Sequence, residues 1–118
     1  MKLVTASVLL ASLASASPAF AHAFLVKADP AIGSTVTSAP SRLLLSYTEG
    51  LEIPFCSVLV KNAAGAVENG KPQAVPGHRN EMSVPLHITA PGTYTVTWHA
   101  VAVDTHHTQG SFKFTVSS

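Results

Sequence analysis

The amino-acid sequence predicts an all-β fold, an antiparallel Greek-key β-sandwich. Six or seven short stretches alternate apolar and polar side chains with the two-residue period of a strand, and turn residues separate them. No stretch after residue 21 sustains helical spacing. Because strands of this kind bury one face each, two sheets packed face to face are the expected architecture.

The first half of the chain contains three predicted strands, at residues 23–27, 41–48 and 54–61. The alternation is clearest in the second of them, with apolar side chains on one face and mostly polar side chains on the other. We expect its apolar face to point into the core. The residues of that face are Leu43, Leu45 and Tyr47.

Cys56 is the single cysteine of the chain, and it shares strand parity with Val58 and Val60. We interpret it as a small buried apolar residue. One cysteine cannot form an intrachain disulfide, so the alternatives are a soft metal ligand or an intermolecular bridge.

In the second half we predict a loop at residues 69–80 with room for one short strand, a strand at 81–88, the clearest strand at 92–103, a histidine-bearing loop at 104–109, and a last strand at 111–116. Alternation again defines the inward side chains. They are Met82, Val84, Leu86, Ile88, Tyr94, Val96, Trp98, Ala100, Ala102, Phe112, Phe114 and Val116.

The first 21 residues have the pattern of a secretory signal peptide. Lys2 precedes an apolar run from Leu3 to Leu13, and Ala19 and Ala21 form a small-x-small cleavage site. The run is too short for a membrane span. We therefore predict cleavage after residue 21, a mature domain at residues 22–118 that begins with His22, and a location outside the cytoplasm.

Charge points to a small partner. The seven Lys and Arg residues include Lys2, so the predicted mature chain has as many basic as acidic side chains, the latter numbering six. No basic patch suggests a nucleic acid. We expect a monomer that binds a small ligand.

A metal site is predicted from the two ends of the mature chain. His22 would offer its α-amine and its ring Nδ1, and Asp104 and His106 would supply a carboxylate and an imidazole. Such nitrogen and oxygen donors suit the tetragonal plane of Cu(II). The alternative is that Asp104 caps a turn and the loop histidines are ordinary surface residues. His107, next to His106, is interpreted as a bystander.

The remaining histidines, His78, His87 and His99, are dispersed along the chain, and we interpret them as ordinary polar residues. Of these, His99 lies on the strand that leads to the predicted site.

Several motifs together resemble the CopC family of periplasmic copper-resistance proteins over essentially the whole mature chain. The resemblance implies a cupredoxin- or immunoglobulin-like β-sandwich and a Cu(II) site made by the amino-terminal histidine, His22, with Asp104 and His106. It also implies that Glu49 supports the site without binding copper. The motifs are His22-Ala23-Phe24-Leu25, the stretch from Asp29 to Val36, Leu45-Ser46-Tyr47-Thr48-Glu49, Trp98, and Asp104-x-His106-x-x-x-Gly110 followed by Phe112 and Phe114.

The expected function is a non-enzymatic carrier or buffer of copper(II) in the periplasm, which delivers copper to an inner-membrane transporter. Some family members have a methionine-rich Cu(I) site, but the mature chain has only Met82, so we expect a Cu(II)-only protein. Two alternatives remain open at this point. One is a histidine-brace copper oxidase of the polysaccharide-monooxygenase type, and the other is a metal-free immunoglobulin-like interaction module.

Overall fold

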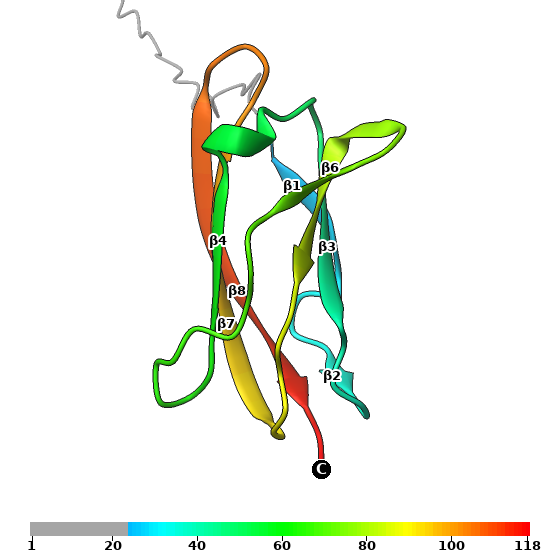
Figure 1. The fold of residues 1–118 in the computed structure, drawn as a ribbon, viewed down its shortest axis with the longest axis vertical. Coiled ribbons are helices and arrows are strands. Elements are labelled where there is room, and N and C mark those ends of the chain that lie inside the picture. Colours follow the sequence, from blue (N-terminus) through cyan, green and yellow to red (C-terminus); the bar gives the residue numbers. More distant parts are fainter. Residues whose placement is uncertain (1–23) are drawn as a thin grey trace, which may run out of the picture.

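Eight strands form two four-stranded sheets that pack face to face in the computed structural model, which describes residues 24–118 (Figure 1). The first sheet has the order β1 (Leu25–Asp29), β3 (Arg42–Tyr47), β6 (His78–Pro85) and β5 (Gln73–Val75). The second has the order β2 (Thr35–Val36), β8 (His107–Val116), β7 (Gly92–Val101) and β4 (Ser57–Lys61). The predicted all-β sandwich is confirmed.

The core lies between the two sheets and contains the alternating side chains that the sequence marks as inward. Leu43, Leu45, Met82, Val84 and Val96 are fully buried. The rest of the predicted inward set is also buried. Burial of apolar area, at roughly 25 cal/mol per Å², is the main force that holds the two layers together.

Some boundaries and one pairing differ from the prediction. Residues 53–55 form a 3-10 helix, η1, where a strand was predicted from residue 54, because Pro54 fits the first turn of a helix and has no N–H for a ladder. β2 pairs in parallel with β8, so the sheets are not purely antiparallel. β6 begins at His78, inside the predicted loop, and β8 begins at His107, which shortens the histidine loop. Within residues 24–118 no helix is long and apolar enough to cross a membrane.

Trp98 closes the core at the end of the sandwich where the β7–β8 loop lies. Its ring meets that of Tyr47 edge to face at a centroid distance of 5.2 Å, a geometry that aromatic pairs prefer. On the neighbouring strand, Gly110 stands opposite Trp98 in the ladder. A Cβ atom at Gly110 would lie 2.6 Å from Cζ2 and 2.9 Å from Cε2 of the indole, so only glycine fits beneath this ring.

Gly110→Ala is expected to destabilise the fold by about 2 to 3 kcal/mol, the usual cost of overpacking a well-packed core. The indole is buried against Tyr47 and cannot swing away cheaply. Urea unfolding of the variant measures this cost. Ser111→Ala, at the exposed neighbouring position, is the control and should cost less than 0.5 kcal/mol. Equal stability of the two variants would contradict the close contact.

Candidate metal centre

Asp104 and His106 lie in the tight loop that joins β7 to β8. The last pair of the ladder is Val101 with His107. Beyond it, the N–H of Ala102 donates to the carbonyl of His106 (3.0 Å), and the N–H of Thr105 donates to the carbonyl of Ala102 (2.8 Å). The loop therefore exposes Asp104, Thr105 and His106 at its tip.

The two predicted ligands contact each other. Asp104 Oδ2 lies 3.1 Å from His106 Nδ1, and Asp104 Oδ1 accepts a hydrogen bond of 3.1 Å from the backbone N–H of His106. The second bond closes an Asx turn, in which the aspartate side chain accepts the N–H of the residue two positions later. Asp104 therefore caps a turn, as the alternative interpretation of this residue predicts. These two contacts hold the side chains of Asp104 and His106 together at the loop tip.

Thr105 gives the loop its shape. Its φ of 74° lies in the left-handed region, which a β-branched residue rarely adopts. Strained residues of this kind occur preferentially at functional sites, where the surrounding structure holds them. Here the reversal at Thr105 places the flanking Asp104 and His106 side by side. The sequence alone gave no signal for this conformation, since threonine is not a residue that favours it.

A second segment, residues 48–52, ties the start of the described chain to this loop. The N–H of Thr48 donates to the carbonyl of Phe24, and the N–H of Phe24 donates to Thr48 Oγ1, both at 2.9 Å. Two residues further on, the carbonyl of Gly50 accepts the N–H of Val103 at 3.0 Å. Phe24 and the Asp104 loop are therefore fastened to the same five-residue stretch, at the same end of the sandwich (Figure 1).

Glu49 lies within this stretch, between Thr48 and Gly50, and is half-buried. The next residue, Gly50, accepts the N–H of Val103, so Glu49 lies one residue from the attachment of the loop. His22 itself lies outside the described residues. It precedes Phe24 by two residues, and two residues span at most about 7 Å.

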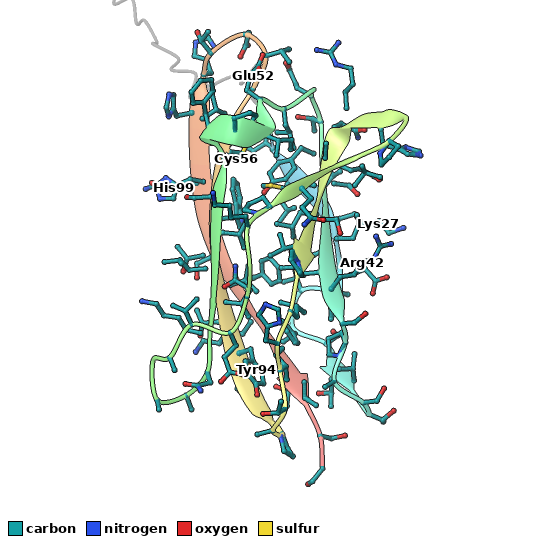
Figure 2. All side chains as sticks on the ribbon, in the orientation of Figure 1. Lys27, Arg42, Glu52, Cys56, Tyr94 and His99 are labelled. Carbon is teal, nitrogen blue, oxygen red and sulfur yellow. The ribbon has the colours of Figure 1, made fainter. Side chains whose placement is uncertain are left out.

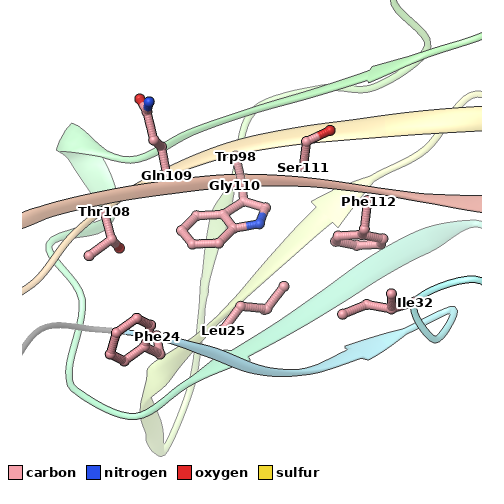
Figure 3. A pocket seen from close by; sticks show the side chains of 9 residues that line it. All are labelled: Phe24, Leu25, Ile32, Trp98, Thr108, Gln109, Gly110, Ser111 and Phe112. Atoms are coloured by element: carbon pink, nitrogen blue, oxygen red, sulfur yellow. The ribbon is translucent and has the colours of Figure 1, made fainter. Parts of the chain in front are cut away.

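A shallow apolar pocket of about 280 Å³ lies beside the loop, between β1 of the first sheet and β8 of the second (Figure 3). Phe24 and Leu25 form one wall, and Trp98 forms its floor under Gly110. Trp98 is the only tryptophan of the chain. Its fluorescence is therefore a built-in reporter for events at this end of the molecule.

The other candidate residues, Cys56 and His107, lie in the core and on the outer face of β8. Cys56 is buried between the layers (Figure 2), and its sulfur accepts the N–H of Val101 at 3.4 Å. Burial raises the pKa of this thiol, which disfavours the thiolate that a metal needs. The prediction that Cys56 is a core residue is confirmed. His107 shares the outer face of β8 with Gln109, as the alternation of the strand requires.

Among residues 24–118, no group of three or more His, Cys, Asp or Glu side chains could hold a metal ion. His78 and His87 are exposed, and His78 Nδ1 lies 4.0 Å from Glu81 Oε1. The described part of the predicted site therefore supplies two donors, Asp104 and His106. The predicted chelate needs His22 in addition.

Comparison with known proteins adds a family match. The family model of the CopC domain matches residues 25–117. Protein YobA from Escherichia coli is 38% identical over 103 residues, which cover 82% of this chain and 80% of that protein. Copper resistance protein C from Xanthomonas campestris is 37% identical, with 90% and 87% of the two chains covered. The copper transport protein CutJ from Bacillus subtilis is 31% identical, and the match covers 82% of this chain but 18% of that longer protein.

Solved structures agree with the fold. The crystal structure of CopC from Methylosinus trichosporium superposes with a TM-score of 0.77 at 25% identity, covering 81% of this chain and 94% of that one. PcoC from Escherichia coli, described as a methionine-rich copper resistance protein, superposes with a TM-score of 0.72 at 28% identity, covering 82% and 100%.

Proposed function

The chain belongs to the CopC family of copper resistance proteins, and from this premise we propose that it carries or buffers copper(II) in the periplasm. In this proposal residues 1–21 are a cleaved signal peptide. One copper(II) ion is held by the α-amine and Nδ1 of His22, by a carboxylate oxygen of Asp104 and by Nε2 of His106.

The observation that carries the proposal is the shared attachment of Phe24 and the Asp104 loop to residues 48–52. An amino terminus two residues before Phe24 can lie at most about 7 Å from Phe24 along the chain. Asp104 and His106 are already in contact at the loop tip. A chelating amino terminus therefore has two further donors waiting at the same end of the sandwich.

The donor set suits copper(II). Three nitrogens and one carboxylate oxygen fit its tetragonal geometry, and copper(II) binds such sites more strongly than the other divalent first-row ions. In this proposal the contact between Asp104 Oδ2 and His106 Nδ1 opens, so that the carboxylate and Nε2 both face the metal. Glu49 supports the site from the neighbouring stretch. Without a cysteine ligand, the spectrum should be that of a type-2 centre and not an intense blue copper site.

The family assignment separates this proposal from its rivals. Relatives that this chain matches are named for copper transport and copper resistance. We therefore take the chain to be a copper-carrying protein of this family and not an enzyme of the polysaccharide-monooxygenase type. A metal-free interaction module does not fit this assignment either. In CutJ the corresponding region is part of a longer copper transport protein. This supports the proposal that the present chain, as a monomer, delivers copper to an inner-membrane transporter.

The test is equilibrium dialysis of the secreted protein against copper(II), together with the mass of its amino terminus. We expect a first residue of His22 and one tightly held copper(II) per chain. Cleavage at another residue, or no tight binding by a chain that begins with His22, would refute the proposed site.

Reduction is expected to release the metal. Soft thioethers are the ligands that copper(I) prefers, and Met82, the only methionine after residue 1, is completely buried in the core. Competition titrations with a copper(I) chelator should show affinity for copper(I) at least tenfold below that for copper(II). Tight copper(I) binding at an independent site would contradict the copper(II)-only assignment.

A further inference from the structure

His99 and His107 lie on the same outer face of the β7–β8 hairpin. The register pairs His99 with Gln109 and Val101 with His107. His99 and Val101 are two apart on β7, and so share a face, as do His107 and Gln109 on β8. Both histidines are exposed, and Figure 2 shows His99 projecting outward from the sandwich.

The hydrogen-bond pattern of the hairpin indicates that His99 and His107 are close diagonal neighbours across the two strands. The carbonyl of Lys113 accepts the N–H of Gly33, and the N–H of Thr115 donates to the carbonyl of Ser34. Odd-numbered residues of β8 thus turn their backbone groups away from β7. Gln109 and His107 consequently form non-hydrogen-bonded pairs with their β7 partners, and in such pairs the side chains lie closer together.

In a pair of this type, right-handed twist brings residue i toward the residue two before its partner. Here residue i is His99, its partner is Gln109, and the residue two before that partner is His107. Diagonal neighbours have Cβ atoms somewhat under about 7–8 Å apart, which long side chains can bridge. Two imidazoles can therefore converge above the amide of Gln109.

The surroundings suit a cation. His99 and Gln109 line a shallow depression of about 300 Å³ on this face, together with Thr97, Gly110 and Ser111. His107 lies outside this depression, on the other side of the His99–Gln109 pair. The cross-strand neighbour of His99 on the other side is Ser57, from β4. None of these lining or neighbouring residues carries a positive charge.

We propose that His99 and His107 form a second copper(II) site, with the amide oxygen of Gln109 as a third donor and water in the remaining positions. Imidazole and oxygen donors suit copper(II). With two nitrogen donors and no chelating terminus, the site is weaker than the one proposed at His22, Asp104 and His106, and it fills at higher copper concentration. The site goes beyond the proposed function and does not depend on it, because neither histidine belongs to the first site.

The experiment is a copper(II) titration against competing chelators of graded strength, on the parent protein, His99→Ala, His107→Ala and the control His87→Ala. His87 is an exposed histidine that follows β6 of the first sheet, outside the β7–β8 hairpin. We expect a second equivalent in the parent and in His87→Ala. His99→Ala and His107→Ala should each weaken the second equivalent on the order of 100-fold, about 2.7 kcal/mol, with the first unchanged.

The unchanged first equivalent shows that each variant is folded. Repeating the titration with His106→Ala removes the first site, and the weaker equivalent should persist there, so that failure of the first site is distinguishable from failure of the second. NMR of the imidazole groups with zinc(II) as the probe should shift the signals of His99 and His107 at the same concentration. The paired site would be overturned if the second equivalent survives in His99→Ala or in His107→Ala, or if zinc(II) shifts the NMR signals of only one of the two histidines. The absence of a second equivalent in the parent protein would overturn it as well.

Discussion

A single residue added ahead of His22 is expected to weaken copper(II) binding by at least a hundredfold while the fold stays intact. The addition turns the α-amine of His22 into an amide, which binds a metal only after losing its proton, so the ring that the free amine and Nδ1 of one residue close on the metal is lost. Loss of one good donor costs several kcal/mol, and each 1.4 kcal/mol is about tenfold in affinity. The sandwich is unaffected, because the buried core begins with Ala28.

Two purified forms, one beginning with His22 and one with Gly-His22, provide the measurement, with a competing copper(II) chelator at fixed pH. Fluorescence of Trp98, which lies beside Phe24 and the loop, offers a direct reading of binding. The matched control carries one extra glycine after Ser118, at the other terminus, and should bind like the parent. Equal affinity of the two amino-terminal forms would remove the amine from the site.

His106→Ala is expected to lower the affinity of the tight site by orders of magnitude, whereas His107→Ala leaves it almost unchanged. The two histidines are adjacent in sequence, but only His106 contacts Asp104. His107 already belongs to β8 and faces outward. His107→Ala therefore serves as the matched control for His106→Ala. The copper(II) affinities of both variants are measured by chelator competition in the tight-binding range.

Asp104→Asn refines this result. The amide keeps an acceptor for the N–H of His106 but loses the charged oxygen donor, so the loop should keep its shape while the metal loses a ligand. We expect weaker copper(II) binding with unchanged urea unfolding. Equal losses from His106→Ala and His107→Ala, or full affinity in Asp104→Asn, would mean that the wrong donors were chosen.

The sequence alone determined the sandwich and its core. In residues 92–101 and 111–116, two-residue alternation assigns each side chain to one face of a strand, and burial of the apolar face leaves no other choice of parity. For the same reason Cys56 could be placed in the core. The Asp-x-His spacing was also visible, because it is local and because the loop between the last two strands was evident.

Only the tertiary structure shows which segments, far apart in the sequence, are neighbours in space. Nothing in the sequence shows that Thr48 holds Phe24 while Gly50 holds Val103, because these bonds join segments that are far apart in the chain. The parallel pairing of β2 and the diagonal of His99 and His107 depend on strand register. A one-residue shift in register would move every side chain of a strand to the opposite face. The register is fixed by the packing of the whole sandwich and by the left-handed turn at Thr105. The sequence pattern does not encode that turn.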